Sequence, residues 1–87
     1  MENEKLLTVM QAISKRTKEL LVERGISQYR LEQESGISHS HMGFILRDKY
    51  NSINLKTVAM LAKGFKMSLL EFLDCGYFSD LNKLDLD

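Results

Sequence analysis

The sequence has no proline and only one cysteine, Cys75, among its 87 residues. A single cysteine cannot form an internal disulfide, which fits a cytoplasmic setting, and no neighbouring base or metal ligand favours a chemical role for it. No run of about 18 apolar residues is present, so no membrane span is predicted. The N-terminal MENEKLLTVM carries acids where a signal peptide would carry bases, so export is not indicated.

The residue groupings that carry catalysis are also missing. Neither a Ser/His/Asp nor a Cys/His set nor a glycine-rich phosphate loop is evident, and so short a chain leaves little room for an enzyme pocket. His39 and His41 are two residues apart, so on a helix they point in different directions and form no metal pair. We therefore expect no enzyme, and no metal, cofactor or small-molecule ligand.

The net charge is zero, which taken alone argues against nucleic acid as a partner, but the charges are unevenly placed. Residues 6–73 carry ten Lys/Arg against six Asp/Glu, whereas both ends of the chain are acidic. Such a mildly basic body still favours phosphate on one face, although its field is weak. The cluster of Lys15, Arg16 and Lys18 is either solvated surface or a set of outer phosphate contacts.

Apolar residues recur at three- and four-residue spacing, and no long stretch alternates with period two, which predicts an all-α protein. The first helix is expected over about 6–24, with Gly25 as its left-handed C-terminal cap. A second helix over about 28–35 has Ser27 as its N-cap. After a break at glycine, Ser38 is expected to cap a third helix.

Two further helices are expected, one capped by Asn54 and one that begins with a capping box formed by Ser68 and Glu71. Met67 and Phe72 are placed to form a hydrophobic staple across that box. The residues expected on the buried sides of the first, third and fourth helices are Val9, Ile13, Thr17, Leu20, Met42, Ile45, Leu46, Leu55, Val58, Leu61, Ala62 and Phe65.

The second and third predicted helices, separated by a short turn that contains Gly36, have the arrangement of a helix-turn-helix unit. Gly36 supplies a backbone angle with φ > 0 that other residues reach only at a cost. Leu31 and Ile37 are expected to pack beneath the turn, while Ile45 holds the third helix against the second. This leaves positions 39, 40, 43, 44 and 47 on the outer side.

From Ile13 to Leu73 the sequence resembles the Cro/repressor-like (XRE-type) helix-turn-helix DNA-binding family. The matching features are the GIS-Q start of the second helix, the L-x-x-x-S-G-I-S turn, the closing TVAMLAKGFKMSLLEFL and the lengths between them. The resemblance implies an all-α, five-helix lambda-repressor-like DNA-binding domain with a short C-terminal extension. We expect residues 1–75 to form this domain and 76–87 to form a tail.

The resemblance also implies that the third helix lies in the major groove of double-stranded DNA, with His39, Ser40 and Phe44 near base edges. Gln28 would bind a phosphate, and the loop after the third helix, including Tyr50, would hold the DNA backbone. The DNA-binding residues expected on this basis are Gln28, Tyr29, Ser38, His39, Ser40, Gly43, Phe44, Arg47, Lys49 and Asn51.

Three departures from the family pattern stand out. Glu32 replaces a usual alanine at a close helix crossing, so it must bend outward to water or loosen that crossing. Leu21 and Leu46 stand where many members pair an arginine with a glutamate, an exchange that is often neutral or stabilising. Gly43 indicates either a close approach of the helix backbone to DNA or a position that contacts nothing. Phe44 indicates either a contact with a thymine methyl group or an exposed aromatic side chain that binds a protein partner.

These features predict a small transcriptional regulator that binds double-stranded DNA sequence-specifically, reading the major groove with its third helix, and acts as a homodimer. The tail residues at helical spacing indicate either a frayed end or a helix formed with a partner. The candidate dimer contacts, which have little core left to enter, are Tyr77, Phe78, Leu81 and Leu84. The alternative function is a protein-interaction module or antitoxin-like partner on the same scaffold.

Overall fold

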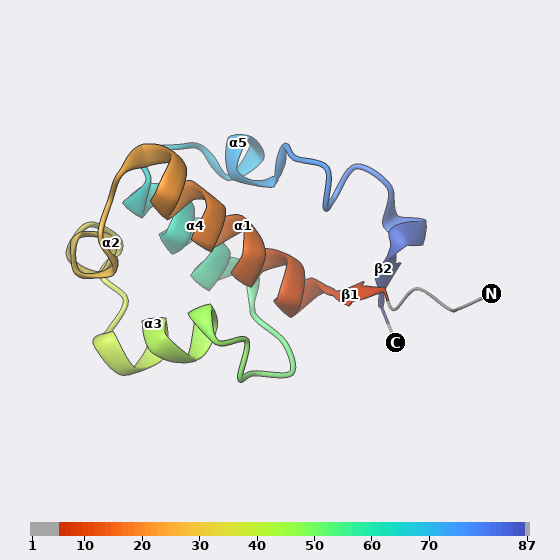
Figure 1. The fold of residues 1–87 in the computed structure, drawn as a ribbon, viewed down its shortest axis with the longest axis horizontal. Helices are drawn as coiled ribbons and strands as arrows, with labels where there is room; N and C mark the ends of the chain where they lie inside the picture. The colour runs from red at the N-terminus through yellow and green to blue at the C-terminus, as the bar shows by residue number, and fades with distance from the viewer. Residues whose placement is uncertain (1–5, 87) are drawn as a thin grey trace.

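Five helices form the body of the molecule, and two short strands near its ends pair with each other (Figure 1). The computed structural model describes residues 6–86. The helices are α1 (Val9–Arg24), α2 (Gln28–Ser35), α3 (His39–Leu46), α4 (Leu55–Gly64) and α5 (Leu69–Leu73). The expected all-α, five-helix fold is confirmed. Within residues 6–86, none of the helices has both the length and the apolar character needed to cross a bilayer.

Side-chain caps fix where the helices begin. Each cap accepts a hydrogen bond from the backbone N–H three residues further on, and the five capping residues are Thr8, Ser27, Ser38, Asn54 and Ser68. The caps expected from the sequence are confirmed, and the Ser68–Glu71 capping box is present. The expected start of α1 near Leu6 is wrong, because Thr8 is extended (φ −74°, ψ 165°) and forms a further capping box with Gln11.

One apolar core joins all five helices. Its fully buried members are Met10, Ile13, Leu20, Leu31, Ile37, Met42, Ile45, Val58, Leu61, Ala62, Phe65 and Phe72. Two expected core residues are wrong, since Val9 is 37% exposed and Leu55 is 66% exposed. Both are the first residue of their helix and lie outside the row of side chains that faces the core. In α1 the next residue, Met10, enters the core instead.

Two arginines of α1 bind backbone carbonyls at the ends of other helices. Arg16 donates from Nε to the carbonyl oxygen of Phe72 at 2.6 Å and from Nη2 to that of Glu71 at 2.9 Å. Arg24 donates to the carbonyl oxygen of Phe65 at 2.8 Å. Such carbonyls have no partner within their own helix. The two alternatives for Arg16, solvated surface or outer phosphate contact, are therefore both wrong, because it anchors α5 to α1.

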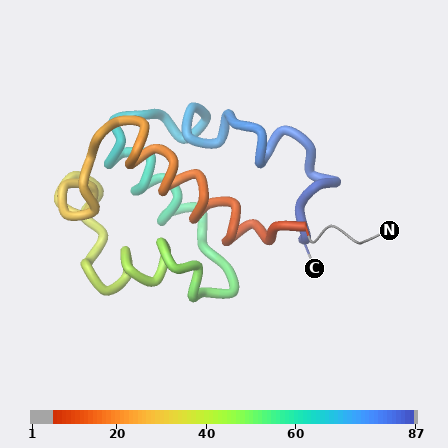
Figure 2. Tube along the Cα trace, in the orientation of Figure 1, coloured from red at the N-terminus to blue at the C-terminus, as the bar shows by residue number. Residues whose placement is uncertain are grey.

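The C-terminal tail returns to the beginning of the chain. After α5 it turns, forms the 3-10 helix Leu81–Lys83, and then adds strand β2 (Leu84–Asp85) in parallel to strand β1 (Leu7–Thr8) (Figure 2). Leu7 pairs with Leu84 in this two-stranded ribbon. The expectation of a frayed or partner-dependent helix is wrong, because the only helical part of the described tail is the three-residue 3-10 helix and the tail packs within the chain itself.

The side chains of the tail are partly used inside the chain itself. Leu84 is 6% exposed and Phe78 packs against the core, so the expectation that they lack a core to enter is wrong for both. Tyr77 donates its hydroxyl to the carboxylate of Glu19, and this hydrogen bond raises the pKa of Tyr77 to about 12. Leu81 is 61% exposed, and its expected role as a contact between two copies of the chain stays a prediction.

Close packing of α2 against α4 depends on a residue without a side chain. A Cβ atom built on Gly64 would lie 2.6 Å from Cδ1 of Leu31 and 3.0 Å from Cβ of Ser35. An ion pair reinforces the same contact, with Nζ of Lys66 2.7 Å from Oε1 of Glu34. The hydrogen bond from Lys66 lowers the pKa of the Glu34 carboxyl. The position of α2 therefore depends on its close approach to Gly64 and on the ion pair between Lys66 and Glu34.

We predict that Gly64→Ala destabilises the protein by about 1–3 kcal/mol, because the added methyl group overpacks the contact between α2 and α4. The measurement is the free energy of unfolding in a urea titration. Gly76→Ala is the matched control, since a Cβ atom at Gly76 would meet nothing within 4 Å. Equal stability of the Gly64→Ala variant and the unchanged protein would contradict a tight α2–α4 contact.

Candidate nucleic-acid interface

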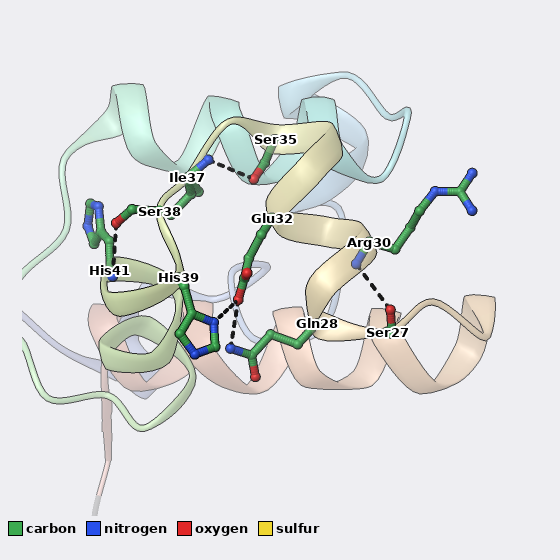
Figure 3. A network of polar contacts seen from close by, with 9 residues as sticks. All are labelled: Ser27, Gln28, Arg30, Glu32, Ser35, Ile37, Ser38, His39 and His41. Atoms are coloured by element: carbon green, nitrogen blue, oxygen red, sulfur yellow. Dashed lines mark hydrogen bonds and ion pairs between the residues drawn. The ribbon is translucent and has the colours of Figure 1, made fainter.

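The turn between α2 and α3 is built as the sequence predicts. Gly36 has φ 80° and donates its N–H to the carbonyl oxygen of Glu32 at 3.0 Å. Ile37 donates its N–H to Oγ of Ser35 at 3.2 Å, as Figure 3 shows, and its side chain is 4% exposed. Leu31 is fully buried on the α2 side of the turn. The two helices are therefore held at a defined angle by a buried plug.

The outer flank of α3 and the start of α2 together enclose an open hollow. It is lined by Gln28, His39, Ser40, Gly43, Phe44 and Arg47, which are six of the ten residues expected to bind DNA. Ser40 is exposed and Phe44 is 41% exposed. No residue of the tail lines this hollow, so within the described residues the tail does not cover the flank. Figure 2 shows the stretch of the tail that follows α5 running along the side of α1 opposite to α3 in this view.

The other four expected residues lie outside the hollow. Tyr29 is 69% exposed on α2, and Lys49 and Asn51 are exposed in the loop that follows α3. Ser38 is exposed too, but its hydroxyl oxygen accepts the N–H of His41 at 3.2 Å and so caps α3. The structure leaves all four accessible to a ligand without placing them in one pocket.

Phe44 is held by a row of ring contacts that the sequence did not predict. Its ring meets that of Tyr50 edge-on, with centroids 5.5 Å apart, and Tyr50 meets His41 in the same manner at 5.3 Å. The guanidinium carbon of Arg47 lies over the ring of Phe44, 5.7 Å from its centroid. The row ties α3 to the following loop, and Phe44 remains 41% exposed.

Gly43 has a structural reason that differs from both sequence-based explanations. It is buried, and the guanidinium of Arg47 folds back over it. A Cβ atom at Gly43 would lie 3.2 Å from Nη1 of Arg47. The glycine is therefore neither without contacts nor an open approach for DNA, because it makes room for a cationic side chain on the face of α3.

Of the two alternatives for Glu32, bending outward to water is wrong, since its side chain is only 10% exposed. Its Oε2 accepts hydrogen bonds from Nε2 of Gln28 and from Nδ1 of His39, each at 2.9 Å (Figure 3). The hydrogen bond from Gln28, with that from His39, lowers the pKa of the Glu32 carboxyl. The residue thus connects the first residue of α2 to the first residue of α3.

Sequence reasoning treated Glu32 only as a departure and missed it as part of the site. The four-residue spacing from Gln28 to Glu32 is a detectable signal, because such residues are neighbours on a helix. The partnership with His39 has no such signal, since it depends on the angle between two helices. Within the part of the chain that the structure describes, no group of three or more His, Cys, Asp or Glu is placed to hold a metal ion.

Comparison with protein families agrees with this geometry. The family model described as Cro/C1-type HTH DNA-binding domain matches residues 16–85, which extend from α1 into β2. The chain belongs to the Cro/C1-type helix-turn-helix family. No curated protein matches the chain. The resemblance inferred from the sequence is confirmed. Membership of this family indicates a DNA-binding protein that acts in transcription regulation, with DNA as its partner.

We predict that Gly43→Ala stabilises this helix-turn-helix protein by about 0.5–1 kcal/mol, since alanine favours the helical backbone over glycine. The guanidinium of Arg47 is the end of a long flexible side chain and can move a few tenths of an ångström to admit the methyl group. The measurement is the free energy of unfolding by chemical denaturation.

Gly25→Ala is a comparison with the opposite sign, because φ at Gly25 is 63° and a side chain there costs roughly 1–2 kcal/mol. A loss of stability in the Gly43→Ala variant would show instead that Arg47 is fixed in place.

Proposed function

We propose that the protein is a transcriptional regulator that binds double-stranded DNA sequence-specifically by laying α3 in the major groove. The observation that carries the proposal is the uncovered flank of α3, with the start of α2 beside it. In helix-turn-helix proteins the second helix of the unit lies in the groove and its N-terminal side chains reach base edges. His39 and Ser40 stand at this end of α3, and the exposed edge of Phe44 suits a thymine methyl group.

Phosphate contacts would come from both sides of this flank. The first N–H groups of α2 have no partner within the helix, and the amide of Gln28 has a second N–H beyond the one given to Glu32. Arg47 and Lys49 supply exposed cations at the other end of α3. Glu32, the acid beside Gln28 and His39, is largely covered and accepts two hydrogen bonds, which limits its repulsion of DNA. Asp48 is an exposed acid between the two cations, so it offsets part of their charge.

The alternative function, a protein-interaction module or antitoxin-like partner, would use Phe44 and the tail to bind another protein. Phe44 instead contacts both Tyr50 and Arg47, which favours a fixed part of a DNA-contacting surface over an anchor for another protein. Protein hot spots are aromatic side chains that insert into a partner's pocket, and Phe44 has little freedom to do so.

Dimerisation would double the DNA contact, because operators for such units have two half-sites about one helical turn apart. We propose that a second copy packs on the apolar strip formed by Val9, Ile53, Leu55, Phe78 and Leu86. Two adjoining hollows that share Val9 and Ile53 make this strip continuous. Leu55 is 66% exposed and Leu86 is 61% exposed, which leaves apolar surface for a partner to cover.

Of the dimer contacts expected from the sequence, the strip includes Phe78. It does not include Leu84, which is buried within the same chain. Tyr77 and Leu81 stay predictions. Deleting the tail would therefore be a poor test of dimerisation, because it removes the buried Leu84 and the β1–β2 pair. Single substitutions on the strip separate association from folding.

We predict that the affinity for mixed duplex DNA falls steeply with salt, and that Arg47→Ala reduces the log–log salt slope by about 1, since each neutralised phosphate releases counterions. The measurement is fluorescence anisotropy over a salt series. Lys83→Ala removes the same charge from the tail, none of whose residues lines the hollow at α3, and should leave the slope unchanged. Equal slopes for the two variants, or no binding to duplex, would favour the protein-interaction alternative.

We predict that the protein sediments as a dimer and that Leu55→Ser weakens self-association at least about tenfold, because a buried leucine contributes roughly 1.5–3 kcal/mol. The measurement is sedimentation velocity across a concentration series. Val22→Ser is the control, since Val22 is 83% exposed and lies outside the strip. A monomer at every concentration, or a dimer that Leu55→Ser leaves intact, would reject the strip as the interface.

A further inference from the structure

We infer that Glu32 determines which bases His39 can recognise, by holding the imidazole with Nδ1 as a donor and presenting Nε2 to the groove as an acceptor. This inference rests on the proposed function. It assigns a specificity-determining role to a residue that need not touch DNA. The contacted chemical group would be an exocyclic amino group, which adenine carries at N6 and cytosine at N4.

The geometry places one nitrogen of His39 inward and leaves the other outward. Nδ1 lies 2.9 Å from Oε2 of Glu32, while the side chain of His39 is 84% exposed. Figure 3 shows the ring reaching from the start of α3 toward the carboxylate, with its second nitrogen on the far side. The carboxylate itself is set by Gln28, whose Nε2 donates to the same oxygen at 2.9 Å. Two helices thus fix the direction of one ring.

The protonation of the ring follows from what a carboxylate can do. An ionised carboxylate has no hydrogen to give, so the ring nitrogen that faces it must be the donor. A glutamate carboxyl of ordinary pKa is already ionised at neutral pH, and the hydrogen bond from Gln28 lowers the pKa of Glu32 further. A neutral imidazole with its hydrogen on Nδ1 has its lone pair on Nε2. The outward atom is then an acceptor.

The surroundings of the ring contain few other charges that could alter this arrangement. The hollow that His39 lines includes one cation, Arg47 at the C-terminal cap of α3, together with the uncharged Gln28 and Ser40. The other histidine of α3, His41, turns to Tyr50. Glu32 from α2 is the acid in hydrogen-bond contact with His39.

An acceptor at this point discriminates between bases in the major groove. Adenine N6 and cytosine N4 are donors there, whereas guanine offers N7 and O6 and thymine offers O4, all of them acceptors. A lone pair on Nε2 therefore favours adenine or cytosine on the contacted strand and opposes guanine or thymine. Without a fixed Nδ1 donor, the ring could adopt either tautomer and would read this position loosely.

The test compares Glu32→Gln with Glu34→Gln. A glutamine at position 32 can either accept from Nδ1 or donate to it, so it no longer selects a tautomer. Glu34 lies on the same helix, and its carboxylate binds Lys66 and Arg30, so its replacement is a matched control for lost charge. Circular dichroism and thermal unfolding establish that each variant is folded.

The first measurement needs no DNA. Long-range ¹H–¹⁵N spectra of the free protein at pH 8 report which imidazole nitrogen of His39 carries the hydrogen. We expect the Nδ1–H form in the unchanged protein and in Glu34→Gln, and a mixture of tautomers in Glu32→Gln. A dominant Nε2–H form in the unchanged protein, or a ring protonated on both nitrogens at that pH, would overturn the inference whatever the DNA results are.

The second measurement is selection of bound duplexes from a random pool. We expect one position enriched in adenine or cytosine, with the preference reduced roughly threefold to tenfold by Glu32→Gln, the effect of one hydrogen bond, and retained by Glu34→Gln. Duplex binding with an unchanged preference in Glu32→Gln overturns the inference alone. Failure of every variant to bind duplex overturns the proposed function and the base reading with it, while the spectra still report the tautomer.

Discussion

The turn from Gly36 to Ser38 is the constraint on which the candidate interface depends. Gly36 reverses the backbone with a positive φ, and Ile37 is then buried as a plug that fixes the angle between α2 and α3. The hollow, the inward nitrogen of His39 and the reach of Glu32 across the turn all require that angle. A small change in the turn would separate the first residues of the two helices.

The placement of charge explains how a chain of zero net charge fits a DNA-binding family. Arg16 and Arg24 of α1 donate hydrogen bonds to backbone carbonyls at the ends of α5 and α4, so part of their role is in folding. Arg47 and Lys49 remain exposed next to α3. Local arrangement, and not the total, therefore decides where an anion is attracted.

Sequence patterns predicted the features whose causes are local. Helix caps, the glycine turn and most of the core follow from residues three or four apart, and the structure has them. The failures are long-range. Glu32 finds His39 only after the helices are placed, and Leu84 is buried only because β2 meets β1. Val9 and Leu55 fit an apolar period but stand at helix starts, where that period does not yet face the core.

The pairing of β1 with β2 also bears on the order in which the molecule assembles. This ribbon joins segments from nearly opposite ends of the chain and has only two residues on each side. Closing so long a loop costs chain entropy that a few ladder bonds barely offset until the helices have already brought the ends together. The ribbon is then the last element to form and the first to open in native fluctuations, and such opening leaves the packed turn between α2 and α3 undisturbed.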